Sequence, residues 1–412
     1  MIAASLSTAT TFEAIPEAQL SFEQAAKTLD LEPWIVERFR HPAEVATTYL
    51  PLTRDSGDPI TVTLLRVRHS AVRAAAIGSL SLLPDLRLQQ CEDLAMQRSW
   101  QAALLGLPLA GASCGLVCDP EELSERELLR LLRAAGRRLG DVATWGSVLF
   151  PGRGCRREFA PKLQAAGGDR KLAIAGGPAC LGGSDLNLSA AEGIAAVVAA
   201  SRRAQGRPPE PVKVAIEGFD ALGDAVCEGL MRDGMTIVAL SDSSGGIYRN
   251  DGLILHDVRA HVAREGVLFG YDEADGISRS ELLRAAADLL VLTSGANLIH
   301  SANANEVAAP IVVEAEWNAI AAGALEQMAG RGVLVIPWLV AGCGALLGAY
   351  LESAQPLCPK SDLLPRVREG MKQMSEAINS YADEKGLPFE GASRLWAIER
   401  AAEVARAFGA DV

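Results

Sequence analysis

The chain has 412 residues, 49% of them apolar, and a formal net charge of −12 at pH 7. This length is enough for two or three domains with well-buried cores. The acidic balance, with no long run of basic residues, argues against nucleic acid or an anionic membrane surface as a partner.

No segment of the sequence predicts secretion, membrane insertion or metal binding. The first basic residue is Lys27, so the start lacks the charged region of a signal peptide. The longest apolar stretch, Trp338–Leu351, is shorter than the ~20 residues of a membrane-spanning helix. The eight cysteines form no Cys-x-x-Cys pair, and no histidine lies near Cys114 and Cys118. We therefore expect a cytoplasmic protein with reduced, buried thiols.

The first half of the chain is predicted to be mainly helical. Residues 1 to about 58 are expected to be helical and irregular, and Pro108–Gly115 to be a glycine-rich turn. Alternating apolar and polar residues predict a half-buried strand over Ile60–Arg68. Apolar spacing and capping residues at Ser124 and Ser189 predict the helices Phe22–Leu29, Glu32–Phe39, Leu88–Leu105, Ser124–Arg138 and Ser189–Arg203.

Strands and helices alternate in the second half, which predicts a parallel, doubly wound sheet. A capping box at Ser278 and Glu281 predicts a helix to Ala287. A proline-rich break is expected over Pro356–Pro365. The predicted strands are Val212–Glu217, Thr236–Leu240, Leu289–Leu292, Ile311–Val313 and Val333–Ile336, and the predicted helices are Asp224–Arg232, Val258–Arg264, Val367–Lys385 and Arg394–Phe408.

A glycine-rich turn follows the strand Val212–Glu217, in the order of a dinucleotide-binding βαβ unit. Its candidate cofactor-binding residues are Gly218, Phe219, Asp220, Ala221, Leu222, Gly223, Asp242 and Ser243. Gly218 and Gly223 fill the first and third glycine positions of the fingerprint, and Asp242 stands near the position of the acid that holds the ribose.

Asp220 occupies the second glycine position, where a carboxylate opposes the approach of a pyrophosphate. One interpretation is that Asp220 caps the following helix and substitutes for the phosphate. The other is a distorted but working cofactor site. Asp242 has two interpretations as well, since it either holds a ribose or caps the turn Ser243–Gly246.

The run Val238–Gly252, VALSDSSGGIYRNDG, closely resembles the second Rossmann strand of the glutamate/leucine/phenylalanine/valine dehydrogenase family. Four further segments resemble the family in the same order along the chain. Gln101–Cys118 resembles its substrate loop, and Leu181–Ser184 resembles the entry of the helix before its cofactor domain. Arg331–Pro337 resembles its last Rossmann strand, and Trp396–Ala402 resembles its closing helix. The resemblance spans roughly residues 20 to 410.

The resemblance implies an α/β fold of two domains with a cleft between them, and assembly into oligomers, often hexamers. The substrate and oligomerisation domain is expected over residues 1–186 plus 352–412, because the closing helices return to it. The Rossmann domain is expected over residues 187–351. The implied activity is reversible oxidative deamination of an amino acid with NAD or NADP.

The family's catalytic groups do not appear at their matching positions. Ile77, Gln101 and Ser113 stand where the resemblance places three lysines, and Arg153 stands where it places an aspartate. Substrate carboxylate binding and the carbinolamine steps need those groups. A nucleophile at Ser113 or Cys114 lacks a nearby histidine, so we expect a turn residue and a core thiol there.

We therefore expect a catalytically impaired member of the family that acts as a structural, regulatory or ligand-sensing subunit. It is expected to form a homo- or hetero-oligomer, with a hexamer as one form and an active paralogue as one partner. A small-molecule ligand is compatible with this interpretation. The alternative is an active NAD(P)-dependent oxidoreductase on an amino acid or a less charged amine or 2-oxo substrate, for which Ile77, Leu80, Gln101 and Ala349 would suit a less charged ligand.

Overall fold

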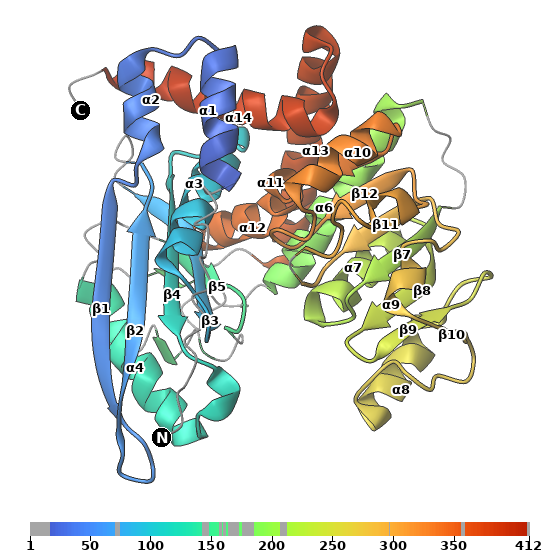
Figure 1. Ribbon diagram of the computed structural model, residues 1–412, viewed down its shortest axis with the longest axis horizontal. Helices are drawn as coiled ribbons and strands as arrows, with labels where there is room; N and C mark the ends of the chain where they lie inside the picture. The colour runs from blue at the N-terminus through green and yellow to red at the C-terminus, as the bar shows by residue number, and fades with distance from the viewer. Residues whose placement is uncertain are drawn as a thin grey trace, which may run out of the picture.

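The computed structural model describes residues 17–70, 75–141, 148–155, 159, 162–163, 173–174, 185–206, 212–295, 297–355 and 359–409. Two α/β layers, each built on its own sheet, lie side by side with helices between and around them (Figure 1). The predicted breakers at 165–170 and 176–178, the likeness at 181–184 and most of the linker at 206–211 fall outside the described residues.

The first sheet has the strand order β1-β2-β4-β3-β5-β6. β2 pairs antiparallel with β1 and β4, whereas β3, β5 and β6 run parallel to β4. Helices α3 and α4 pack on opposite faces of it. Its elements are α1 (Glu17–Thr28), α2 (Pro33–Arg40), β1 (Glu44–Thr53), β2 (Pro59–Arg68), β3 (Ala76–Leu83), α3 (Leu88–Leu104), β4 (Ala110–Val117), α4 (Glu125–Asp141), β5 (Val148–Pro151) and β6 (Ala173–Ile174).

The second sheet confirms the predicted doubly wound arrangement. Its order is β10-β9-β8-β7-β11-β12-β13, with five parallel strands and an antiparallel extension at β9 and β10. Helices α6 and α7 cover one face, and α9 and α10 the other. The elements are α6 (Leu186–Ala204), β7 (Lys213–Glu217), α7 (Ala221–Arg232), β8 (Thr236–Asp242), β9 (Gly245–Tyr248), α8 (Leu255–Glu265), β10 (Asp275–Ile277), α9 (Arg279–Leu282), β11 (Leu289–Leu292), β12 (Ile311–Glu314), α10 (Ala322–Gly330) and β13 (Leu334–Ile336).

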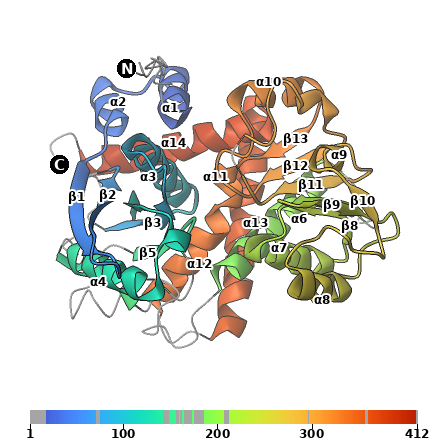
Figure 2. The same cartoon turned by 60° about the horizontal axis from the view of Figure 1, so that its bottom comes forward.

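The last four helices join the two layers. They are α11 (Trp338–Ala341), α12 (Cys343–Ala354), α13 (Lys360–Lys385) and α14 (Phe389–Phe408). Helices α12 and α13 pack on α6, and α14 returns to the first layer, where it packs against α1 and α3 (Figure 2). This return confirms the expected course of the closing helices.

Two predictions for the first half were wrong, because strands form there. Residues 44–53 are not irregular but form β1, an edge strand in which a proline, Pro51, is tolerated. The predicted turn Pro108–Gly115 is largely the central strand β4. A Cβ on Gly111 would lie 2.0 Å from the carbonyl oxygen of Ala95, so the glycine serves close packing of β4 against α3.

Three smaller predictions also needed correction. Helix α6 begins earlier than predicted and is capped by Asp185, whose carboxylate accepts a hydrogen bond from the Asn187 backbone; Ser189 lies inside the helix. The capping box at Ser278 is present, but α9 ends at Leu282. Pro365 lies inside α13 rather than in a break, because the burial of neighbouring side chains on that helix outweighs a lost hydrogen bond.

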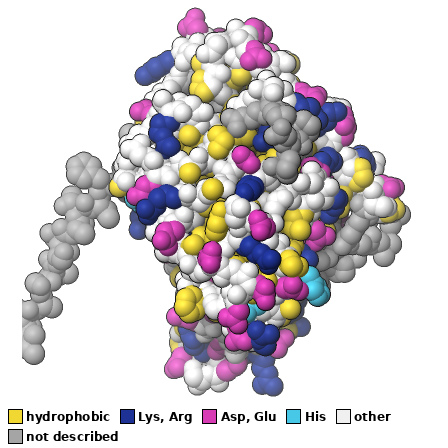
Figure 3. All heavy atoms as spheres, turned by 90° about the vertical axis from the view of Figure 1, so that its right-hand side faces the viewer, with side chains coloured by type: hydrophobic (Ala, Val, Ile, Leu, Met, Phe, Trp, Pro, Cys, Tyr) yellow, Lys and Arg dark blue, Asp and Glu magenta, His cyan; other side chains and the backbone are white. Residues whose placement is uncertain are grey.

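None of the described helices is both long and apolar enough to cross a membrane. On the face of the molecule shown in Figure 3, acidic and basic side chains are interspersed with small apolar areas.

Candidate functional site

The turn between β7 and α7 retains the two glycines of a dinucleotide fingerprint for reasons of packing. Gly218 adopts φ of 101°, a conformation that favours glycine, and a Cβ on it would lie 2.5 Å from the Thr293 hydroxyl. A Cβ on Gly223 would lie 2.0 Å from the Gly218 carbonyl oxygen. Both glycines are therefore needed for helix α7 to start close to the strand, whether or not a nucleotide binds.

Asp220 caps helix α7. Its Oδ1 accepts hydrogen bonds from the backbone nitrogens of Leu222 and Gly223, both at 3.0 Å. Backbone donors at a helix N-terminus are the groups that bind a phosphate in this kind of turn. The carboxylate thus takes two donors that a pyrophosphate would need. Its neighbours Phe219 and Ala221 are half-buried and exposed, respectively.

Asp242, at the end of β8, has both carboxylate oxygens engaged within the protein. Oδ1 accepts a hydrogen bond from the Ser244 backbone at 2.7 Å, and Oδ2 accepts one from the Leu268 backbone at 2.8 Å. Ser243 is exposed beside it and lines an open groove together with Phe269. Asp242 therefore caps its turn, and its hydrogen bond to Leu268 holds the loop that follows α8 against the end of β8.

The end of β7 carries a buried carboxylate. Glu217 is 2% exposed and is paired with Arg279, whose Nε donates to Glu217 Oε1 at 2.6 Å. The Ser294 hydroxyl donates to the same carboxylate. Burial raises the pKa of Glu217, and the Arg279 charge opposes that rise. This cluster joins β7 to the segments around α9 and β11.

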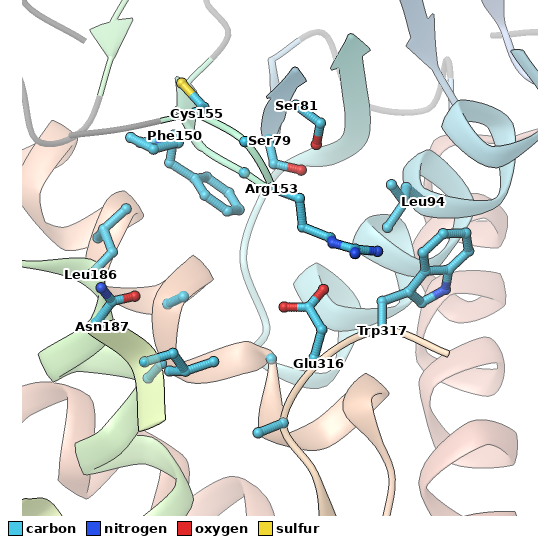
Figure 4. A pocket seen from close by; sticks show the side chains of 18 of the residues that line it. Ser79, Ser81, Leu94, Phe150, Arg153, Cys155, Leu186, Asn187, Glu316 and Trp317 are labelled. Carbon is cyan, nitrogen blue, oxygen red and sulfur yellow. The ribbon is translucent and has the colours of Figure 1, made fainter. Parts of the chain in front are cut away.

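A cleft lies between the two sheets, at the carboxyl ends of the second sheet's strands, where open α/β sheets bind their ligands. Its volume is about 400 Å³. Arg153 points into it from the segment after β5, toward Glu316 and Trp317 on the loop after β12 (Figure 4). Enclosure raises the pKa of Glu316, although part of its side chain remains exposed, and the positive charge of Arg153 opposes the rise.

Of the four positions predicted to match catalytic residues, only Arg153 lines this cleft. Ile77 and Gln101 are fully buried, and Ser113 is 1% exposed. Ser113 pairs with Ser79 in the sheet and lies under α3, where its side chain is hydrogen-bonded to the Cys91 thiol. The structure thus places Arg153 in the cleft and the other three residues in the core.

Within the part of the chain that the structure describes, no base is placed to activate Ser113 or Cys114. Burial raises the pKa of the Cys114 thiol to about 12. The ring of His69 is enclosed between Phe39 and Trp100, and burial lowers its pKa to about 4. Both His69 nitrogens are engaged, with the Ser99 hydroxyl and the Phe39 carbonyl. Among the described residues, no cluster of three histidine, cysteine or acidic side chains is suited to a metal ion.

The sequence reasoning missed Arg98, which lines the cleft from α3 and is 6% exposed. Its guanidinium carbon lies 4.6 Å from the ring centre of Trp338 and 4.8 Å from that of Phe150. Its Nη1 donates to Gln101 Oε1 at 2.6 Å. One signal in the sequence could have pointed to Arg98. It stands three residues before Gln101, and this spacing puts both side chains on one face of a helix.

Two family models match the chain. The model described as Glutamate/Leucine/Phenylalanine/Valine dehydrogenase matches residues 182–409, and the dimerisation domain of Glu/Leu/Phe/Val dehydrogenases matches residues 42–147. The chain belongs to this family. The first of these regions carries the second sheet, and the other carries strands β1 to β4 of the first sheet. The resemblance noted in the sequence is therefore confirmed.

Several members of the family are similar over nearly the whole chain. NAD-specific glutamate dehydrogenase A of Halobacterium salinarum is 29% identical, over 96% of this chain and 93% of its own. Glutamate dehydrogenase of Thermotoga maritima is 29% identical, over 92% and 94%. The crystal structure of hetero-hexameric glutamate dehydrogenase from Thermus thermophilus, in a leucine-bound form, has a TM-score of 0.88 and 27% identity, covering 96% of this chain and 98% of that one.

Proposed function

We propose that this protein is a catalytically silent member of the amino-acid dehydrogenase family and serves as a subunit beside an active paralogue. The observation that supports the proposal is that three positions which the resemblance matches to lysines are buried, while a carboxylate accepts hydrogen bonds from the backbone at the start of α7. Ile77, Gln101 and Ser113 are core residues, and the Asp220 carboxylate takes two backbone donors at the start of α7.

The chemistry of the family explains why these replacements matter. As the resemblance implies, lysines hold the substrate carboxylate and activate water, and an aspartate moves protons. Loss of one such acid–base group commonly costs roughly 10²–10⁴ in rate. A buried isoleucine or serine supplies neither a positive charge nor a base, and a guanidinium such as that of Arg153 has no hydrogen-bond acceptor with which to serve as a base.

Assembly into oligomers is proposed from the relatives. The match over residues 42–147 is to a dimerisation domain, and the similar Thermus thermophilus enzyme is a hetero-hexamer. A silent chain that keeps the fold can complete such an oligomer and alter its activity. We infer a structural, regulatory or ligand-sensing role in the cytoplasm, as a homo-oligomer or a hetero-oligomer.

Co-expression with an active dehydrogenase of the family from the same organism tests this role. We expect a mixed oligomer of defined stoichiometry in native mass spectrometry, with turnover per active subunit that differs from that of the active enzyme alone. A control uses the Thermotoga maritima enzyme, with which no mixed oligomer should form. Separate oligomers of the two co-expressed chains, with unchanged turnover, would contradict the hetero-oligomeric role.

A further inference from the structure

Four arginines form a row along the outer face of helix α4. They stand at positions i, i+4, i+7 and i+11, so they fall within about 60° of one another around the helix axis and span about 16 Å along it. All four side chains are exposed. This arginine stripe consists of Arg126, Arg130, Arg133 and Arg137.

The opposite face of α4 holds the helix in place without help from the arginine stripe. Its leucines are buried against the first sheet, and burial of apolar surface is the dominant favourable contribution to folding. These leucines are Leu128, Leu131, Leu132 and Leu139. Helix α4 lies on the outside of the first layer, away from the second layer (Figure 2). Substitutions in the stripe should therefore leave the fold intact.

One half of the arginine stripe is partly neutralised within the protein and the other half is not. Arg130 Nη2 donates to Asp55 Oδ1 at 2.7 Å. Glu127 is 5% exposed and turns inward, where it accepts hydrogen bonds from two backbone nitrogens. Arg133 and Arg137 form no hydrogen bond or ion pair with any other residue that the structure describes. Like charges three and four residues apart repel, so this row does not stabilise the helix by itself.

A row of cations suits an anionic partner, and two observations favour a protein over a nucleic acid. The net charge of −12 repels any long polyanion that extends beyond the stripe. Helix α4 also lies within residues 42–147, the region that matches a dimerisation domain. A helix with carboxylates at the same spacing would match the row, because a guanidinium forms paired hydrogen bonds with a carboxylate.

The arginine stripe also discriminates between partners. Two copies of this chain that met through α4 around a twofold axis would place one stripe against the other, since such an interface uses the same patch on both subunits. Like charges that face each other across an interface are costly and act against the wrong partner. A different subunit with an acidic helix at that place would be attracted instead.

We propose that the arginine stripe of α4 is a docking surface for an acidic helix of a different subunit, and that it favours this subunit over a second copy of the chain. The inference rests on the proposed function for the identity of the partner, an active dehydrogenase of the family from the same organism. It goes beyond that function by assigning the surface and the charge of the contact.

Association of the full-length chain with that dehydrogenase, followed by biolayer interferometry, tests the docking surface. The double variant Arg133→Glu/Arg137→Glu reverses the two unpaired charges and keeps the pair of Arg130 with Asp55. Because opposite charges steer the encounter, we expect its association rate constant to be about ten- to a hundredfold below that of the wild type. Raising NaCl from about 50 to about 500 mM should slow association of the wild type far more than that of the variant.

The matched control is Arg264→Glu/Arg284→Glu, which changes the net charge by the same amount at two exposed arginines of the second layer. It should associate like the wild type. Circular dichroism checks that each variant is folded. If the reversal on α4 does not fold, Arg133→Gln/Arg137→Gln removes the same two charges without adding acidic groups and should still slow association, by a smaller factor.

The double variant Arg133→Lys/Arg137→Lys locates the contact on the partner. It keeps both charges and introduces amines, which a carbodiimide joins to carboxylates in direct contact as amide bonds, with loss of water. We expect mass spectrometry of the mixed oligomer to find both lysines linked to aspartates or glutamates of one helix of the dehydrogenase. Links to no carboxylate of the dehydrogenase would contradict the inference.

The remaining outcomes separate this inference from the proposed function. A mixed oligomer that forms equally fast with Arg133→Glu/Arg137→Glu would overturn the docking surface and leave the proposed function standing. A wild type that forms no mixed oligomer would overturn both. An equal loss of self-association in the variant would assign the stripe to copies of this chain, and stripe-dependent binding of single-stranded DNA at about 150 mM NaCl would assign it to nucleic acid; either result would contradict the inference.

Discussion

Replacing Asp220 by glycine is expected to lower the Kd for NADH by roughly ten- to a hundredfold. The substitution releases the backbone donors of Leu222 and Gly223 and removes a negative charge from the place of the pyrophosphate. Hydrogen bonds to a charged group contribute about 1.5–3 kcal/mol, and each ~1.4 kcal/mol is tenfold in affinity. Glycine is tolerated as a helix cap, so the cost in stability should be only a few tenths of a kcal/mol. Trp317 and Trp338 line the cleft and supply the fluorescence signal.

Asp220→Asn is the matched control, because it keeps a capping side chain and loses only the charge. Its gain in NADH affinity should be smaller than that of the glycine variant. An unchanged Kd in Asp220→Gly, or a wild type that already binds NADH as tightly as the variant, would show that Asp220 does not substitute for the phosphate.

Replacing Arg279 by methionine is expected to reduce the free energy of unfolding by about 2–4 kcal/mol at pH 7. The change leaves the buried carboxylate of Glu217 without its cation, and breaking a fully buried pair typically costs ~3–5 kcal/mol. The Ser294 hydroxyl still donates to Glu217 and Arg279 is partly exposed, so a smaller loss than for a fully buried pair is expected. Urea unfolding followed by circular dichroism gives the value.

The loss in Arg279→Met should depend on pH. The pKa of Glu217 is raised in the folded state, so folding takes up a proton between its unfolded and folded pKa values. Removal of Arg279 raises the folded pKa further. The destabilisation should therefore be largest at neutral pH and shrink as pH falls through the raised pKa. Arg284→Met removes an exposed pair with Glu306 and should cost at most ~1 kcal/mol. Equal losses in the two variants, or a loss independent of pH, would refute the assignment.

The architecture of the second sheet could be predicted from the sequence because its central strands are continuous apolar runs. Leu289–Leu292 is fully buried between two helix layers, and such a short apolar run is typical of a central parallel strand. The first sheet was harder to predict. The glycines of β4 are a pattern that is typical of a turn. In the structure, Gly111 is required because Ala95 of α3 approaches it closely. This contact joins two segments that only folding brings together.

The motif positions of the proposed silent site could be located from the sequence, but the surroundings of their side chains could not. The motif positions located Gln101 and Asp220, and the capping interpretation of Asp220 matches the observed hydrogen bonds. Arg98 has no counterpart in a motif, and its importance depends on the enclosure by Phe150 and Trp338 from other elements. Burial and pairing of a charge follow from tertiary contacts, which a sequence pattern does not specify.

Turnover by the purified chain alone is the most direct test of its catalytic silence. L-Glutamate, L-leucine, L-phenylalanine and L-valine are each supplied with NAD and with NADP, and reduced cofactor is followed by absorbance beside the Thermotoga maritima enzyme. Under the proposed function several acid–base and binding groups are replaced, and each such group commonly contributes roughly 10²–10⁴ in rate, so we predict kcat/KM values below about a thousandth of that enzyme's best value. A value above that limit for any of these amino acids would contradict the account and favour an active dehydrogenase.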